Sequence, residues 1–463
     1  MFSTLAIVVS LLMLMFFAYR GYTVLLLAPI MAGLAVLLSG DAGFLLPIYT
    51  ETFMTALGNY LLKFFPVFLL GALFGQLMAD SGAAAAIAKG TVNVLGSSRA
   101  ILVVVVACGL LTYGGVSLFV VAFAIYPISK VLFIEAKIPK RLIPASIALG
   151  SFTFTMTALP GTPAIQNAIP IPYYGTNAFA APGLGIIGGL VMFLGGWWWL
   201  QSRANKAQAA GEGYGTHKDD GADMAEVDSQ NMSFALALLP LVLVIGVNAL
   251  FTYFIFPQTD FSFLTDKYPN LKVSGQLGLW SIIISLVVAC AVLMIMRWKT
   301  WHDLQSTINR GVYGSMLPIF NTASEVGYGA VIASLAGFVI IRDWVLGVAP
   351  GNPLISETIA MTTLAGITGS SSGGLSIALQ TLGADYLRMA AESNISPELL
   401  HRVAVMAAGG FDTLPHCGAV ITLLSICGLN HKQSYLNIAA VTIIVPMFAV
   451  ITVITLGTMF GSF

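Results

Sequence analysis

Charged residues are scarce in this sequence. Only 9% of the 463 residues are Asp, Glu, Lys or Arg, whereas a soluble globular domain has about 25%. Hydrophobic residues make up 57%, and the mean hydropathy is +0.89. Because water could not solvate such a surface, the sequence predicts an all-α polytopic membrane protein. The 20 basic and 20 acidic residues cancel, so no basic patch favours nucleic acid as a partner.

Cysteines and signatures of catalysis are also few. The four cysteines, Cys108, Cys290, Cys417 and Cys427, lie in apolar segments without metal-ligand spacing. We expect them to be small buried side chains. No H-E-x-x-H motif occurs, and no loop is long enough to carry a catalytic domain. We therefore expect neither an enzyme nor a cofactor or metal site.

Apolar segments long enough to cross about 30 Å of hydrocarbon recur along the chain. Several exceed one helix or are interrupted by Gly and Pro, so we expect roughly ten to fourteen membrane segments, re-entrant hairpins included. Residues 1–52 hold the N-terminal spans, and 233–297 hold the connecting spans. The one clearly polar stretch, 201–232, is predicted to be a flexible linker.

Basic residues predict the orientation of the chain. Lys and Arg cluster at 130–141 and at 297–310, and such clusters favour the cytoplasmic side of a membrane. The linker at 201–232 lies two spans before the second cluster, so we expect it to be cytoplasmic too. The intervening loop, 257–275, is then predicted to face outside.

Four short patterns occur in the same order in the two halves of the chain. The matched pairs are 65–75 with 317–327, 114–117 with 373–376, 138–144 with 395–401, and 157–165 with 412–421. They predict a first repeat at 53–200 and a second at 298–463. The basic bias of the loops changes sides between the halves, so we expect inverted repeats, which are typical of secondary transporters.

Two glycine-rich polar stretches interrupt apolar segments: T-Y-G-G-V-S at 112–117 and T-G-S-S-S-G-G-L-S at 368–376. Non-helical backbone at membrane depth is tolerated where protein or a water-filled cavity satisfies it. Glycine permits such backbone, Ser and Thr supply donors, and the next helix begins with partial positive charge. We predict that the two breaks face each other and bind a small anion. Close helix packing through small residues is the alternative.

A second pair of breaks lies at 155–170 and 412–416, where prolines interrupt the helical pattern. Gln166 and Asn167 need partners in their apolar setting and are predicted to line the site, with capping of re-entrant hairpin ends as the alternative. The predicted substrate-binding residues are Gly114, Gly115, Ser117, Thr157, Thr162, Gln166, Asn167, Ser370, Ser371, Ser372, Gly373, Gly374, Thr413 and His416.

Ionisable residues inside apolar segments are costly and are therefore functional candidates. The second half contains Glu325, Asp412 and His416, and the first half contains Lys63, for which an interfacial position is favoured. Because a desolvated carboxyl group takes up a proton more readily, Asp412 and Glu325 are predicted to couple transport to protons. We place no arginine in the middle of a span, so helix ends and hydroxyl groups are expected to hold the anion.

These motifs resemble the gluconate permease (GntP-type) family of the ion transporter superfamily over nearly the whole chain. The resemblance rests on G-A-L-F-G-Q-L-M-A-D-S-G-A-A-A (71–85), the G-G-V-S break, A-L-P-G-T-P-A (158–164), I-S-P-E (395–398) and F-D-T (411–413). The last motif places Asp412 at the family's aspartate. The resemblance implies proton-driven uptake of a small hydroxylated monocarboxylate, such as gluconate, a related sugar acid, D-serine or 3-hydroxybutyrate. It also implies a bacterial inner-membrane location.

Three positions depart from the family pattern. P-G-T-P (160–163) stands where many members have P-P-H-P, Pro415-His416 where many have Phe-Trp, and Glu325 where many have a small residue. The missing histidine predicts a less polar pocket, which favours 3-hydroxybutyrate over gluconate. A sodium-coupled carboxylate transporter and a passive channel for organic anions are the alternatives. The sequence leaves the oligomeric state open, a homodimer included.

Overall fold

The computed structural model describes residues 2–215, 232–269, 271, 273–349 and 351–463, and every regular element within them is a helix. The N-terminal helices are α1 (Phe2–Tyr19), α2 (Val24–Leu38), η1 (Ala42–Phe44), α3 (Leu45–Pro47) and the π-helix η2 (Ile48–Phe53). The first half then comprises α4 (Met54–Asp80), α5 (Ala83–Leu95), η3 (Ser97–Arg99), α6 (Ala100–Tyr113), α7 (Leu118–Glu135), η4 (Lys140–Leu142), α8 (Ile143–Ser151), α9 (Phe154–Thr157), α10 (Ile165–Ala168), α11 (Ile171–Tyr174) and α12 (Pro182–Ala209).

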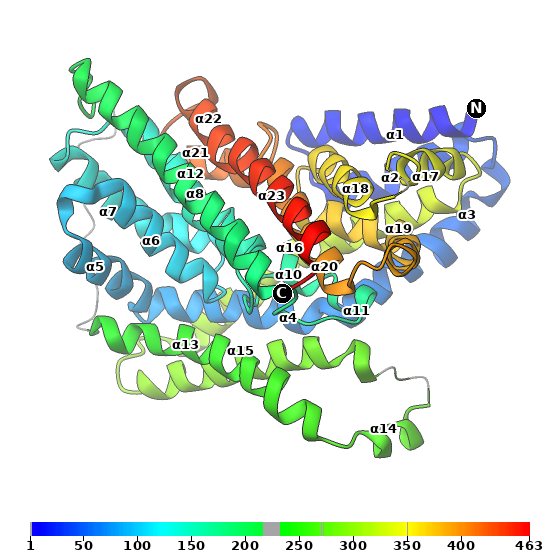
Figure 1. Ribbon diagram of the computed structural model, residues 1–463, viewed down its shortest axis with the longest axis horizontal. Coiled ribbons are helices and arrows are strands. Elements are labelled where there is room, and N and C mark those ends of the chain that lie inside the picture. The colour runs from blue at the N-terminus through cyan, green and yellow to red at the C-terminus, as the bar shows by residue number, and fades with distance from the viewer. Residues whose placement is uncertain (1, 216–231, 270, 272, 350) are drawn as a thin grey trace.

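The connecting helices lie along one side of the molecule (Figure 1). They are α13 (Phe234–Leu250), η5 (Phe251–Ile255), η6 (Phe256–Gln258), α14 (Ser262–Lys267), η7 (Val273–Gly275) and α15 (Leu277–Met296). The second half comprises α16 (Leu304–Ser334), α17 (Phe338–Leu346), α18 (Pro353–Thr368), α19 (Ser371–Glu392), α20 (Pro397–Phe411), α21 (Gly418–Ile426), α22 (His431–Ala439), η8 (Ala440–Ile444) and α23 (Val445–Phe460).

The same order of elements occurs in both halves. Each half begins with a long helix that contains a proline, Pro66 in α4 and Pro318 in α16. A shorter helix follows, α5 or α17, and then a helix–break–helix pair, α6–α7 or α18–α19. A second interrupted stretch and a final helical segment complete each half. This order agrees with the four sequence matches, whereas the opposite orientation of the halves stays a prediction.

The two halves pack closely against each other. α4 runs along α16, and α12 lies beside α23 (Figure 1). Glycines on α16 permit this approach: a Cβ atom at Gly311 would lie 2.8 Å from the Cα of Leu73, and one at Gly327 would lie 2.9 Å from the ring of Phe53. Small residues at such contacts let helix backbones meet.

Among the described residues, five helices are long and apolar enough to cross a membrane, or up to seven if each bent helix pair is one span. The bent pairs are 83–95 with 97–113, at 108°, and 304–334 with 338–346, at 98°. Several other apolar segments of the sequence form shorter helices that end at the breaks. The structure thus has the predicted broken helices, with fewer full-length spans than the apolar stretches alone indicate.

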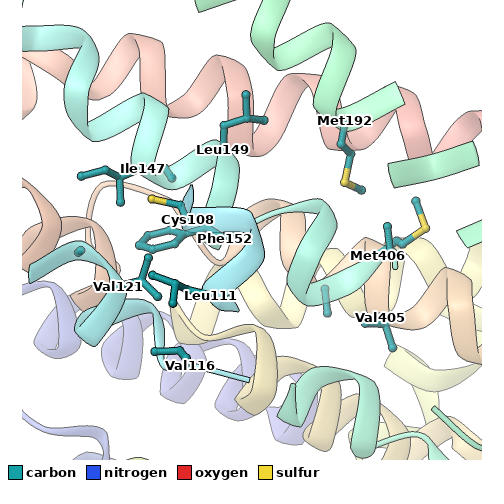
Figure 2. Packing of buried hydrophobic residues seen from close by; sticks show 14 of the residues in the cluster. Cys108, Leu111, Val116, Val121, Ile147, Leu149, Phe152, Met192, Val405 and Met406 are labelled. Atoms are coloured by element: carbon teal, nitrogen blue, oxygen red, sulfur yellow. The ribbon is translucent and has the colours of Figure 1, made fainter. Parts of the chain in front are cut away.

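Buried apolar side chains surround the crossing of α6 and α8 (Figure 2). Cys108 and Phe152 lie side by side there, and a Cβ atom at Gly150 would lie 2.5 Å from the Cβ of Cys108. All four cysteines are free and buried, which confirms the prediction that they are small core side chains.

The predicted linker is shorter than expected. α12 continues to Ala209, because residues 201–209 are mostly good helix formers and Gln201 donates to Asn205 one turn later at 2.9 Å.

After the helix, Glu212 binds Arg141 at 2.8 Å. This hydrogen bond to Arg141 holds the pKa of Glu212 below its usual range, so the attachment is present at neutral pH and is lost in acid. The contact places the basic 130–141 loop and the start of the linker on the same side. Residues 216–231 of the linker lie outside the described residues.

We predict opposite effects for two alanine substitutions on α16. Gly311→Ala should lower the free energy of unfolding by about 1–3 kcal/mol, because its methyl group would overlap the backbone of α4. Gly314→Ala, one turn away with nothing within 4 Å of its Cβ position, should leave stability unchanged or raise it by up to about 1 kcal/mol through helix propensity. Thermal unfolding of the purified proteins in detergent tests this. Equal stability of the two variants would contradict the close α4–α16 contact.

Candidate functional site

The T-G-S-S-S-G-G stretch forms a sharp break between α18 and α19. α18 ends at Thr368, and Gly369 takes a left-handed backbone with φ of 66°, a conformation that favours glycine. Ser370 then caps α19: its hydroxyl accepts a hydrogen bond from the Gly373 amide at 3.1 Å. The positive end of a 22-residue helix therefore begins at this break.

The carboxyl group of Glu325 lies against this helix start. A Cβ atom at Gly373 would lie only 1.5 Å from Oε2 of Glu325, so no other residue type fits without moving the carboxyl group. Glu325 is 2% exposed, and its Oε2 has no hydrogen-bond partner in the described part of the chain. The sequence match between 65–75 and 317–327 therefore contains a buried acid in its second copy.

Asp412 approaches the same helix start from the second break. It follows α20 directly, is 8% exposed, and lies within interaction range of both the hydroxyl and the amide of Ser371. Oδ1 of Asp412 accepts no hydrogen bond from the described residues. Gln166, from the second break of the first half, donates to the Ser371 hydroxyl at 3.0 Å. Three of the four predicted breaks therefore meet at Ser371.

Further hydroxyl groups complete this arrangement. Ser372 lies 3.3 Å from both Thr322 and Ser370. The Tyr60 hydroxyl, on α4, faces Ser376 and Glu325. Neither the Tyr60 Oη nor the Ser376 Oγ forms a hydrogen bond within the described residues. We call the following set the central cluster: Tyr60, Gln166, Thr322, Glu325, Ser370, Ser371, Ser372, Gly373, Ser376 and Asp412.

The 112–117 stretch interrupts the helical pattern as predicted, but neighbouring side chains pack on its two glycines. Gly115 has φ of 98°, and its Cβ position lies 2.7 Å from Pro163. Leu241 of α13 covers Gly114, where a Cβ atom would lie 2.2 Å from the Leu241 side chain. Ser117 precedes α7 without a side-chain capping bond, and its amide lies 3.3 Å from the Cβ position of Gly75. Gly374 is likewise packed on the Ala365 backbone. At these glycines the contacts match the helix-packing alternative.

Asn167 connects the two halves instead of pointing an unused group inward. Its amide donates to the carbonyl oxygens of Thr162 and Ala178, at 3.0 and 2.8 Å. Its oxygen lies 3.2 Å from His401 Nε2 and accepts from Arg402 at 3.2 Å. Each hydrogen-bonding position of this side chain is therefore taken by a protein group.

A buried arginine was not predicted from the sequence. Arg402 lies in α20 and is fully buried. Its guanidinium donates to the carbonyl oxygens of Thr157 and Ala180 and to the Asn167 side chain, at 2.9–3.2 Å. Three first-half oxygens, remote in sequence, compensate for the burial of this guanidinium. The expectation that no arginine lies in the middle of a span stays a prediction.

A buried acid was missed as well. Glu357, in the second turn of α18, is fully buried and accepts a hydrogen bond from Tyr174 at 2.5 Å. Glu357 therefore adds a buried ionisable residue to the three that the sequence predicts for the second half, Glu325, Asp412 and His416. The sequence does mark this residue, because Glu357 is an acidic residue within the apolar segment 354–383.

The remaining predicted residues lie around the cluster. Thr157 packs on Gly409 and donates to Thr153. Thr162 is buried, and its hydroxyl accepts from the Ala164 amide at 3.3 Å. Thr413 turns toward η8 and bonds Thr442 at 2.7 Å. The His416 ring covers Gly369, with Cδ2 3.1 Å from the Cβ position. Lys63 stands over the Tyr173 ring at 5.2 Å.

Residues 369–373 read G-S-S-S-G, which also fits the G-x-S-x-G pattern of serine hydrolases. In those enzymes the serine sits on a turn between a strand and a helix. Here the stretch joins two helices, and the central Ser371 accepts from Gln166. The structural context of that catalytic motif is not met.

Comparisons with known proteins agree with this architecture. The sequence model of the family described as GntP family permease matches residues 1–338. A Bacillus subtilis (strain 168) protein named Uncharacterized transporter YxjC is 45% identical over 465 residues, covering 97% of this chain and 98% of that protein. The solved structure of Neisseria gonorrhoeae MtrF, described with a class of antimetabolite efflux pumps, aligns with a TM-score of 0.58 at 14% identity. It covers 91% of this chain and 85% of MtrF, a likeness of fold.

We predict that Asn167→Leu destabilises the protein strongly. It removes one acceptor from the buried Arg402 and two donors from buried carbonyl oxygens, which should lower the free energy of unfolding by about 3 kcal/mol. Asn205→Leu is the matched control, because Asn205 is exposed on α12 and bonds only Gln201 among the contacts described. Thermal unfolding in detergent measures both. A wild-type melting temperature for Asn167→Leu would refute the role of Asn167 as the connection between the halves.

Proposed function

We propose that this chain, which belongs to the GntP permease family, is a proton-coupled symporter for a small hydroxylated monocarboxylate. The family consists of transporters, and the all-helical fold with broken helices is that of a multi-pass membrane protein. Uptake would proceed by alternating access, with the substrate held at the central cluster.

The observation that carries the proposal is the position of two acids at one helix start. Glu325 and Asp412 flank the Ser370–Gly373 turn, which is also the place where backbone amides and hydroxyl groups can bind an anion. Two carboxylates at this point would repel a third negative charge. Once both carry protons, the same groups offer O–H donors. Proton binding and anion binding therefore support each other.

Several groups supply the attraction for the anion. The α19 N-terminus contributes partial positive charge, and Ser370, Ser371 and Ser372 contribute hydroxyl groups. Arg402 lies behind α10, bonded to Asn167, the neighbour of Gln166 in sequence. Its bonds to Thr157, Asn167 and Ala180 go to neutral oxygens, so its positive charge adds to the potential of the site.

The unused hydroxyl groups support a hydroxylated substrate. Tyr60 and Ser376 lie beside Glu325 and have no partner in the described chain, and a ligand hydroxyl group could bond either of them. The stretch 160–163 lacks the histidine that many family members have. We therefore propose 3-hydroxybutyrate as the substrate before gluconate. We also propose a bacterial inner-membrane location and assembly as a homodimer.

Uptake by purified protein in proteoliposomes tests the proposal. Accumulation of labelled 3-hydroxybutyrate that follows an imposed proton gradient is the expected result. Accumulation that follows a sodium gradient would favour the sodium-coupled alternative, which the two carboxyl groups and nearby hydroxyl oxygens would suit chemically. Equilibration without accumulation would identify a passive channel. Competition by a panel of short hydroxy acids would then rank the substrates.

We predict that Asp412→Asn abolishes proton-driven accumulation but keeps exchange of labelled for unlabelled substrate. The amide is always neutral, so it mimics the protonated acid for binding but can neither take up nor release a proton. Uptake under a proton gradient and counterflow without one are measured on the same vesicles. Asp385→Asn is the control, because Asp385 pairs with Arg388 near the exposed end of α19. Undiminished accumulation by Asp412→Asn would remove Asp412 from the mechanism.

We predict that Gly373→Ala greatly weakens substrate binding without preventing membrane insertion. The methyl group would occupy the position of Glu325 Oε2 and displace the carboxyl group from the helix start. Gly383→Ala on the same helix is the matched control, because its nearest neighbours lie at ordinary contact distances of 3.7–3.8 Å. Substrate-dependent thermal stabilisation reports binding. Equal stabilisation of both variants would show that the turn serves packing alone.

A further inference from the structure

Glu357 occupies a closed polar site outside the central cluster. It lies in the second turn of α18, a helix that Asn352 caps, and its side chain is fully buried. The Tyr174 hydroxyl donates to Oε1 at 2.5 Å. The other oxygen, Oε2, has no hydrogen-bond partner among the residues that the structure describes.

The neighbouring hydroxyl groups of Ser356 and Tyr386 donate their hydrogens elsewhere. Ser356 donates its only hydrogen to the Val345 carbonyl at 2.7 Å. The hydroxyl group of Tyr386 lies 3.3 Å from Ser356 Oγ and must therefore be the donor in that contact. Tyr386 thus has a lone pair, and no hydrogen, to offer toward Glu357. A proton on Glu357 would supply the donor that this group of oxygens lacks.

No described cation pairs with Glu357. On α20, His401 bonds Thr176 and Asn167. On α17, Arg342 pairs with Asp343 at the surface. On α4, the Lys63 ammonium lies over the ring of Tyr173.

The other titratable groups facing Glu357 are the phenols of Tyr174, from α11, and Tyr386, from α19. α1, which also packs on α18, has no acidic or basic side chain. An enclosed carboxylate with a single donor and no cation is unfavourable, whereas the neutral acid is not.

The Tyr174–Glu357 bond joins the two halves of the molecule. Tyr174 belongs to α11, in the segment that follows the second break of the first half. Its neighbours make parallel contacts: Tyr173 donates to Gln380 at 3.0 Å, and Thr176 bonds His401 at 2.6 Å. Residues 171–176 are therefore held on α18, α19 and α20 by three side-chain hydrogen bonds. Only the bond to Glu357 involves a carboxyl group.

We propose that Glu357 and Tyr174 form a second proton-binding site, at which the bound proton holds α11 of the first half against α18 of the second. The reaction is the addition of one proton to the Glu357 carboxylate, and no other bond changes. Loss of that proton leaves an anion that needs water or a cation, and α11 must then separate from α18 to admit either. That this separation belongs to a transport cycle rests on the proposed function.

Infrared spectroscopy of the purified, substrate-free protein at neutral pH tests the proton directly. The wild-type spectrum minus that of Glu357→Gln should show the loss of a carbonyl band of a protonated carboxylic acid. Tyr174→Phe should shift that band, because the phenol donates to one of the two oxygens. Glu392→Gln, at the exposed end of α19, is the control and should remove carboxylate bands instead. Loss of carboxylate bands in Glu357→Gln would overturn the proposal.

A folding defect does not block the test. If Glu357→Gln is not recovered as a monodisperse protein, the Tyr174→Phe spectrum decides: a shifted acid band supports the site, and an unchanged acid region overturns it. Tyr173→Phe is a matched control, because it removes the neighbouring phenol, which bonds Gln380 and not Glu357. This variant should leave the acid band in place.

The link to transport is measured separately. In proteoliposomes, Glu357→Gln should lose proton-driven accumulation and retain counterflow, whereas Glu392→Gln should behave as the wild type. Full accumulation by Glu357→Gln would remove this site from the transport cycle. If the wild type itself accumulates nothing under a proton gradient, the proposed function fails, while the infrared result still decides whether Glu357 carries a proton.

Discussion

The contact between the Glu325 carboxyl group and the Cα of Gly373 constrains the whole centre of the molecule. Because Oε2 occupies the place of a Cβ atom, the Glu325 carboxyl group can approach the first turn of α19 this closely only because residue 373 is glycine. The contact brings an acid to the positive end of a helix, where burial and an unfilled hydrogen bond make its charge state matter. The break before α19 and its serine cap form this helix start, and Asp412 approaches it from the other side at Ser371.

Polar contacts between the halves explain why interrupted helices are useful in this fold. Gln166 reaches Ser371, Asn167 reaches Arg402, and Tyr174 reaches Glu357. All three come from residues 165–174, where short helices alternate with turns. A continuous helix would use its backbone groups internally and place side chains on regular faces. The broken segment instead points successive side chains at three different helices. The irregular chain on either side of it, at Thr157 and Ala180, offers carbonyl oxygens to the buried guanidinium.

Much of this organisation could be predicted from the sequence, because it depends on local chemistry. Glycine, serine and proline mark the breaks, so the stretches at 112–117, 155–170, 368–376 and 412–416 all interrupt helices as expected. Gln166, Ser371 and Asp412 meet in the structure, whereas the facing of the 112–117 and 368–376 breaks stays a prediction. Other features depend on residues remote in sequence and are not visible in the sequence alone. In the sequence Arg402 resembles a loop residue, but in the structure the oxygens of Thr157, Asn167 and Ala180 surround its guanidinium. Likewise, Gly114 and Gly115 resemble a binding turn in sequence, but Leu241 and Pro163 pack on them.

The proposed direction of transport rests on the charges at the site and not on the fold. MtrF shares the fold at 14% identity and is described with efflux pumps, so the architecture alone does not set a direction. If proton and substrate exclude each other from a site, an inward proton gradient drives the substrate outward. At the α19 N-terminus the opposite relation is proposed: an anion can enter beside Glu325 and Asp412 only after these acids are neutralised. Proton and anion then share the same occupied state and cross together. An inward proton gradient would therefore drive accumulation, and replacing either acid by its amide would remove that coupling without removing the anion site.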